Sequence, residues 1–292
     1  VRGVMSCRIT SVLILFLVCL IPASLLAQVR VIGTLNPSTA GNATPGFCGI
    51  AFDGNVDPLL LDRLSWGVSR VSLQDASVVW SSAGNPPQYN ANAQLTYDPT
   101  TGDYYTTEGN DRLVRLAPGN FAVSPVGDGI GAFFNFVALA TDPQGQLWLA
   151  TDMGGGELWT VDKQTGIGTL YTMLHLPVGH QLTSMTIDSA GDFVISAFRN
   201  YGGTPSYICQ VDPTTGNTSV LSDGPTNPEG VVEAMAYDPL SRGFYGVLED
   251  RSVSPYGDSL VQFTGISLPE PSSIGLLGLF AVIACRRSRL GG

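Results

Sequence analysis

A pattern of short segments recurs five times along this chain, and it constrains the fold more than any other feature. In each copy a short apolar strand runs into a turn that begins with aspartate, and an aromatic-bearing strand follows. The turn aspartates are Asp53, Asp98, Asp142, Asp188 and Asp238, so the spacings are 45, 44, 46 and 50 residues. Periods of roughly 40–50 residues are typical of four-stranded propeller blades. The sequence therefore predicts an all-β propeller, with five four-stranded blades.

The third copy, residues 137–171, shows the internal order of a blade most clearly. The strands VALAT, QLWLAT, ELWTV and IGTLY alternate with the turn and loop sequences DPQG, MGGG and DKQTG. Asp-Pro followed by Gly suits a type I turn that leads into a left-handed residue. MGGG lacks the lysine and the strand-to-helix context of a phosphate-binding loop, so it is interpreted as a variable blade connection.

The two ends of the repeated region predict how the ring closes. The last copy ends at Phe263-Thr264 after only three strands, and one unassigned strand, Val29 to Leu35, precedes the first copy. Its IGTL sequence repeats that of residues 167–170, which is a fourth strand. We therefore expect residues 29–35 to complete the last blade as its outermost strand, which leaves only short sheet edges exposed.

Composition fits this fold and excludes one class of partner. Charged residues make up 13% of the chain, and the 35 glycines and 19 prolines suit a turn-rich β protein. All 24 acidic residues lie between Asp53 and Glu270, but five of the 14 basic residues lie near the two ends, so the stretch between Arg8 and Arg286 carries 9 − 24 = −15. A protein surface with this net negative charge repels nucleic acid. The two cysteines of the repeated region, Cys48 and Cys209, leave open whether one disulfide forms.

Residues 1–27 have the layout of a secretory signal peptide, with a predicted signal helix. Two arginines precede an apolar run from Val12 to Ile21, and cleavage is expected between Ala27 and Gln28. The predicted propeller domain then spans residues 28–267. An exported protein of the cell envelope, surface or exterior is expected.

The C-terminal segment, residues 268–292, predicts a short membrane helix. Pro269, Glu270 and Pro271 precede an uncharged, mostly apolar run of 12 residues from Ile274 to Cys285. This run is shorter than the roughly 20 residues that cross a bilayer. The arginines that follow it, which indicate a cytoplasmic side, are Arg286, Arg287 and Arg289.

These C-terminal features resemble the PEP-CTERM sorting signal of Gram-negative bacteria. The resemblance rests on the Pro-Glu-Pro motif at 269–271, the apolar helix and the arginine cluster, in that order. It implies recognition and processing by an exosortase-type membrane protease-transpeptidase, and export in a bacterium that makes extracellular polysaccharide and biofilm. The repeated body resembles secreted propellers with YVTN or lactonase-like units.

Few residues of the body carry recognisable chemistry. His175 and His180, in the sequence HLPVGH, are the only histidines and are candidate metal ligands, although most metal sites need three or four protein ligands. Glu233, Glu249 and Asp250 are candidate calcium ligands, because residues 233–250 weakly resemble the repeats of phytase-like propellers and calcium takes 6–8 oxygen ligands. Loop hydrogen bonding and chance clustering explain the same residues. No nucleophile motif occurs, so no catalytic residue is assigned.

Four tryptophans are candidates for stacking on sugars wherever they are exposed. Trp148 and Trp159 occupy alternating strand positions, which favours packing between blades, whereas Trp66 and Trp80 are not restricted in this way. The leading hypothesis is an exported propeller that binds a partner such as extracellular polysaccharide or a surface protein. One alternative is a secreted metal-dependent hydrolase or lactonase-like enzyme, and another is a structural protein of the biofilm matrix.

Overall fold

The computed structural model describes residues 28–35, 46–62, 67–82, 94–109, 112–131, 136–152, 156–198, 206–223, 230–250, 257–266 and 268. Every regular secondary-structure element in these ranges is a β-strand. Among the described residues no helix is long and apolar enough to cross a membrane. The predicted signal peptide and the Pro-Glu-Pro motif with its apolar run and arginine cluster lie outside these ranges, so both stay predictions.

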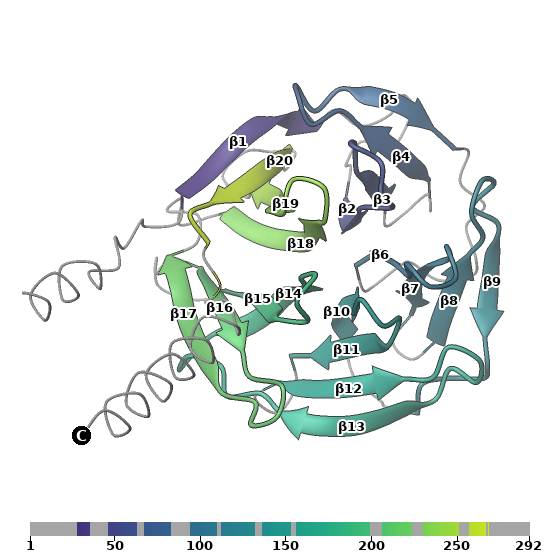
Figure 1. Cartoon of the computed structure of the whole chain (residues 1–292), viewed down its shortest axis with the longest axis vertical. Helices are drawn as coiled ribbons and strands as arrows, with labels where there is room; N and C mark the ends of the chain where they lie inside the picture. Colours follow the sequence, from purple (N-terminus) through teal and green to yellow (C-terminus); the bar gives the residue numbers. More distant parts are fainter. Residues whose placement is uncertain are drawn as a thin grey trace, which may run out of the picture.

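Five four-stranded antiparallel sheets surround a central axis, which confirms the predicted five-bladed propeller (Figure 1). Blades 1 to 4 are meanders whose first strand lies nearest the axis. Blade 1 contains β2 (Phe47–Ala51), β3 (Leu59–Asp62), β4 (Val68–Val71) and β5 (Val78–Ser81); blade 2 contains β6 (Thr96–Tyr97), β7 (Tyr104–Glu108), β8 (Arg112–Leu116) and β9 (Val123–Val126). Blade 3 contains β10 (Phe136–Thr141), β11 (Leu147–Thr151), β12 (Glu157–Val161) and β13 (Gly168–Met173); blade 4 contains β14 (Gln181–Ile187), β15 (Phe193–Phe198), β16 (Tyr207–Val211) and β17 (Thr218–Asp223).

Blade 5 is assembled from both ends of the repeated region, as predicted. Its sheet order is β1 (Gln28–Leu35), β20 (Gly257–Thr264), β19 (Gly243–Asp250) and β18 (Gly230–Asp238). β1 pairs antiparallel with β20 from Gln28 opposite Thr264 to Leu35 opposite Asp258. Gly33 lies against the neighbouring blade, where an added Cβ would come within 2.5 Å of the Asp75 carbonyl oxygen. The N-terminal strand therefore closes the ring and also packs on blade 1.

Apolar side chains fill each of the five interfaces between neighbouring blades. The interface of blades 1 and 2, for example, contains Leu59, Val68 and Leu95, all at most 1% exposed. Cys48 lies in this cluster, whereas Cys209 lies in the cluster between blades 3 and 4. Both cysteines are buried free thiols, so the disulfide that the sequence left open does not form. Burial raises the pKa of the Cys209 thiol to about 12.

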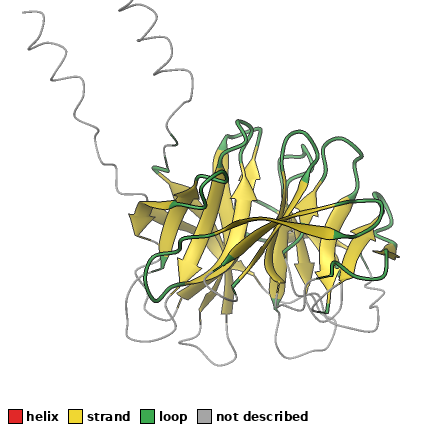
Figure 2. Cartoon of the chain, turned by 90° about the horizontal axis from the view of Figure 1, so that it is seen from below, coloured by secondary structure: helices red, strands yellow, loops and turns green. Residues whose placement is uncertain are grey.

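Two kinds of tight turn gather on one face of the ring, which we call the turn face (Figure 2). One kind joins the first and second strands of a blade and begins with a repeated aspartate. The other joins the third and fourth strands and closes with an N–H to C=O bond from the fifth residue to the first, as in Gly166 to Asp162 at 2.8 Å and Gly216 to Asp212 at 2.7 Å. The fifth residue has a positive φ, so glycine suits this position.

Candidate functional site

The central channel contains a cavity of about 70 Å³ on the turn-face side. Each of the five innermost strands contributes the residues just before its turn aspartate. The lining residues are Ile50, Ala51, Phe52, Gln94, Leu95, Thr96, Tyr97, Leu139, Ala140, Thr141, Met185, Thr186, Ile187, Met235, Ala236 and Tyr237. No carboxylate, imidazole or thiol belongs to this described lining, so it offers no charged metal ligand.

Gln94 closes the channel at the level of this cavity. It belongs to blade 2, which lies across the axis from blades 4 and 5 (Figure 1). Its Nε2 donates to the Met185 carbonyl and, at 3.1 Å, to the Met235 carbonyl, while its Oε1 accepts from the Met185 N–H at 3.2 Å. An innermost strand pairs on one side only, so backbone groups that point toward the axis need a partner from outside their own sheet. Gln94 thus binds three blades together across the axis.

The five turn aspartates surround this channel but cap their own turns. Asp142 accepts from the N–H groups of Gln144 and Gln146, and Asp188 accepts from those of Ala190 and Asp192. Asp98 also joins two blades, because Lys163 Nζ from the blade 3 turn lies 2.5 Å from its Oδ2. The recurring aspartate that identified the repeat is therefore a structural residue.

The two predicted metal-binding histidines lie in the connection between blades 3 and 4. The His175 N–H donates to the Gly216 carbonyl at 2.8 Å, which ties this connection to a blade 4 turn. His180 Nδ1 lies 3.2 Å from the Val178 carbonyl oxygen, and its ring centroid lies 4.7 Å from that of Tyr207. Nothing in the described ranges groups three or more His, Cys, Asp or Glu side chains as metal ligands would require.

The predicted calcium ligands all belong to blade 5. Glu233 lies in β18 at an irregularity of the ladder between Val232 and Ala234, and Glu249 lies in β19 opposite Val231. Asp250 ends β19, and its side chain lies outside the described atoms. Among the described residues, these carboxylates therefore do not form a group of three or more possible metal ligands.

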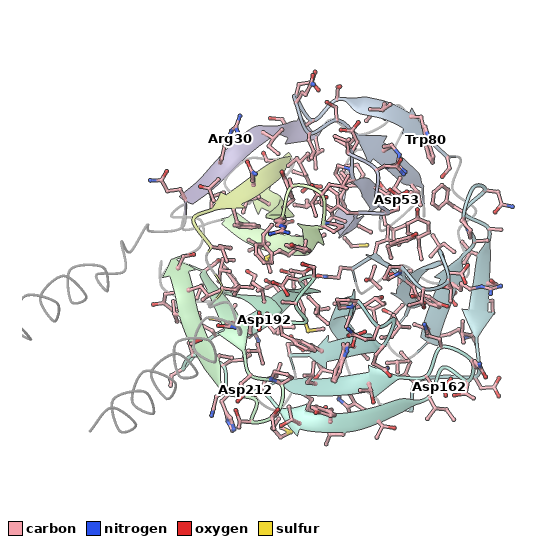
Figure 3. The ribbon with its side chains drawn as sticks, viewed as in Figure 1. Arg30, Asp53, Trp80, Asp162, Asp192 and Asp212 are labelled. Atoms are coloured by element: carbon pink, nitrogen blue, oxygen red, sulfur yellow. The ribbon has the colours of Figure 1, made fainter. Side chains whose placement is uncertain are left out.

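A larger hollow lies on the turn face between blades 1 and 2, and we call it the aromatic cleft. Its volume of about 340 Å³ falls within the roughly 300–1,000 Å³ of small-molecule sites. The lining residues are Asp53, Arg70, Trp80, Tyr97, Gly102, Tyr104, Pro118, Gly119 and Phe121. Figure 3 shows Asp53 nearer the axis and Trp80 nearer the rim. A second hollow of about 380 Å³, beside blade 4, is lined without aromatic residues.

The aromatic rings of the cleft pack in a chain of edge and tilted contacts. The centroids of Tyr97 and Tyr104 lie 5.2 Å apart, those of Tyr104 and Phe121 5.5 Å, and those of Phe121 and Trp80 5.5 Å. These separations fall in the favourable range for ring pairs. Tyr104 and Phe121 are buried, but Trp80 is 39% exposed, so its ring is positioned from behind and still open to a ligand.

A bidentate ion pair lies in the same cleft. Arg70 Nη2 lies 2.6 Å from Asp53 Oδ2 and Nη1 lies 3.2 Å from Oδ1, while the Tyr104 hydroxyl donates to Oδ2 at 2.8 Å. Burial of the Asp53 carboxyl opposes ionisation, but hydrogen bonds from Arg70, Asn55 and Tyr104 outweigh it and lower the pKa of Asp53 to about 2. Burial, together with this carboxylate, raises the pKa of the Tyr104 hydroxyl, which stays a hydrogen-bond donor.

Backbone strain marks one wall of the cleft. Phe121 occupies the fifth position of its turn, where blades 3 and 4 have Gly166 and Gly216, and its φ is 51°. A bulky residue in this left-handed region costs on the order of 1–3 kcal/mol, and such strain is concentrated at functional sites. Blades 3 and 4 have glycine at this position and blade 1 has Ala76 with a φ of 60°, whereas blade 2 has a phenylalanine whose ring packs against Trp80. A phenylalanine at this turn position was the sequence signal that could have predicted the cleft.

Three of the four tryptophans lie within the described residues. Trp148 and Trp159 are partly buried against the cores on either side of blade 3, which confirms their packing role. Trp80 lines the cleft, and Trp66 lies outside the described residues. Sequence reasoning missed the partners of Trp80, namely Arg70, Tyr97, Tyr104 and Phe121, because they come from different strands and turns.

Comparison with solved structures agrees on the propeller fold. Glutaminyl cyclase of Myxococcus xanthus superposes with a TM-score of 0.52 at 16% identity, over 82% of this chain and 98% of that chain. A luciferin-regenerating enzyme gives a TM-score of 0.51 at 14% identity, over 82% and 96%. An engineered GH43 glycoside hydrolase gives 0.56 at 11% identity, over 81% of this chain and 52% of that chain.

These identities establish a shared fold and nothing finer. No protein-family model matches the chain, and no curated protein matches it. The lactonase-like resemblance of the body therefore holds at the level of the propeller fold, whose neighbours include enzymes by name.

Proposed function

We propose that this protein is an exported, envelope-associated β-propeller that acts as a binding module, and that its ligand occupies the aromatic cleft. The observation that carries the proposal is the cleft itself, which combines ligand-sized volume, an open Trp80 ring and the charged groups of Arg70 and Asp53. Pockets of this kind, apolar with a few convergent polar groups, are typical binding sites. The strained Phe121 turn supports the same location.

The enzymatic and structural-matrix hypotheses gain no specific support. The described lining of the central cavity has no carboxylate, imidazole or thiol, and Gln94 bridges the channel at this level. The enzymes among the fold neighbours are too distant in sequence to transfer an activity. Binding without turnover is therefore the function we propose.

The cell-envelope part of the proposal rests on the two ends of the sequence. A signal-peptide pattern at 1–27 and a PEP-CTERM-like segment at 268–292 support export and sorting by an exosortase-type protease-transpeptidase. Substituting the 269–271 motif by Ala-Gln-Ala in the producing cells tests this step. We expect the protein to be lost from the envelope or surface fraction and retained in the inner membrane. Unchanged distribution would contradict sorting through this motif.

Binding at the cleft is tested on the purified full chain with three panels of ligands: soluble oligosaccharides, synthetic peptides and small metabolites. The variant Trp80→Ala removes the open wall, and Tyr171→Ala is its matched control. Tyr171 is 51% exposed, lies on an outermost strand and is outside the cleft. We expect at least one panel to bind wild type and Tyr171→Ala equally and Trp80→Ala weakly. If no ligand of any class depends on Trp80, the proposed function is wrong.

A further inference from the structure

We infer that the aromatic cleft recognises an uncharged sugar residue, which stacks on Trp80 while its hydroxyl groups bond to Arg70 and Tyr97. The inference rests on the proposed function, because it names the ligand of that same cleft. It follows from three features of the described residues: the aromatic wall, the unused hydrogen-bonding groups and the balance of charge.

The aromatic wall suits a sugar ring. One face of a pyranose presents C–H groups with slight positive charge, which meet the negative face of an aromatic ring favourably. Trp80 is 39% exposed, and its ring packs at 61° against Phe121. Phe121 in turn packs on the buried Tyr104. Because the platform is already held in place, little conformational entropy is lost when a ligand stacks on it.

The polar groups of the cleft leave donors available. Asp53 is saturated, because Oδ1 accepts from the N–H and Nδ2 of Asn55 and from Arg70, and Oδ2 accepts from Arg70 and the Tyr104 hydroxyl. Arg70 also donates from Nη1 to the Asp57 carbonyl at 2.6 Å. A guanidinium has five N–H donors, so Nε–H and the second Nη2–H remain without a partner among the described residues.

These two donors share one edge of the planar guanidinium, at the spacing that suits a pair of neighbouring oxygens. The Tyr97 hydroxyl likewise has no hydrogen-bond partner among the described residues, and a phenol both donates and accepts. Sugar hydroxyls also donate and accept. Adjacent hydroxyls of one ring therefore match the Arg70 edge and the Tyr97 hydroxyl together.

Charge decides between a neutral and an acidic sugar. Asp53 neutralises Arg70, and the lining formed by the described residues contains no other lysine or arginine. The propeller domain, residues 28–267, carries a formal charge of 9 − 23 = −14, which repels an additional carboxylate or phosphate. An uncharged residue satisfies the free donors without facing this repulsion. The cleft therefore favours neutral sugars over uronic acids.

Calorimetry on the full chain with neutral tetrasaccharides of gluco, galacto and manno configuration, and with uronate tetrasaccharides, tests the inference. We expect one neutral series to bind at least about tenfold more tightly than the uronates. Trp80→Ala should weaken this binding at least about tenfold. Tyr97→Phe, which removes only a hydroxyl, should weaken it about three- to tenfold. Tyr171→Ala should leave it unchanged, and added salt should change it little because the ligand is uncharged.

The outcomes separate this inference from the proposed function. Trp80-dependent binding of peptides or metabolites, without any saccharide binding, overturns the inference and leaves the binding module intact. Equal or tighter binding of uronates overturns the preference for uncharged sugars. Saccharide binding that survives Trp80→Ala places the site elsewhere and overturns the inference. Melting curves of each variant establish that a lost signal comes from the cleft and not from unfolding.

Discussion

The hydrogen bonds of Gln94 across the channel predict a large stability loss for Gln94→Leu. Gln94 is 2% exposed and bonds to the Met185 N–H and to the carbonyls of Met185 and Met235. Leucine has a similar volume but no polar group, so three backbone groups of the buried Met185 and Met235 lose their side-chain partner. The expected loss is about 3–5 kcal/mol in the free energy of unfolding. For a domain of this size it lowers Tm by about 6–20 °C.

Denaturant titration and calorimetry of the full chain measure this effect. Ser184→Ala is the control, because Ser184 occupies the equivalent position of blade 4 and its buried hydroxyl has no hydrogen-bond partner in the described part of the chain. That variant should melt within about 2 °C of wild type. If Gln94→Leu costs less than about 0.5 kcal/mol, the Gln94 bonds do not join the blades and the argument is wrong.

Three further predictions concern closure, acidity and redox state. Deleting residues 28–35 exposes the β20 edge and removes the buried Leu35, so Tm should fall by about 10 °C or more, and an unaltered melt would refute ring closure. The folded pKa of Asp53 is about 2 against 3.8 unfolded, so its contribution of about 2 kcal/mol is present above pH 3.8 and is lost as pH falls toward 2. Asp53→Asn should flatten that part of the stability profile, and a profile as steep as that of wild type would contradict the assignment. Since Cys48 and Cys209 are free, a reducing agent should leave Tm unchanged, whereas losing a disulfide typically costs about 2–5 kcal/mol.

The fold was predictable because its information is local and repeated. Each blade carries its own strand alternation and turn chemistry, and the aspartates at 53, 98, 142, 188 and 238 give the period directly. Ring closure was predictable for the same reason, since a missing fourth strand at one end matched an extra strand at the other. These inferences needed no knowledge of which side chains meet in space.

The candidate site was not predictable in the same way. The sequence drew attention to His175, His180 and the blade 5 carboxylates because those residue types often carry chemistry. The cleft instead combines residues from blade 1, such as Arg70 and Trp80, with residues from blade 2, such as Tyr97 and Phe121. No spacing along the chain indicates that these side chains line one hollow.

By itself, the sequence determined the all-β class, the five blades, the closing strand and the acidic character of the body. Periodicity and composition are properties of the chain, so they can be read without coordinates. Only the tertiary structure decided that Gln94 closes the channel, that Cys48 and Cys209 stay apart, and that Trp80 and Arg70 share a cleft. Each of these depends on the distance between different strands or blades, which the packing of the buried interfaces sets.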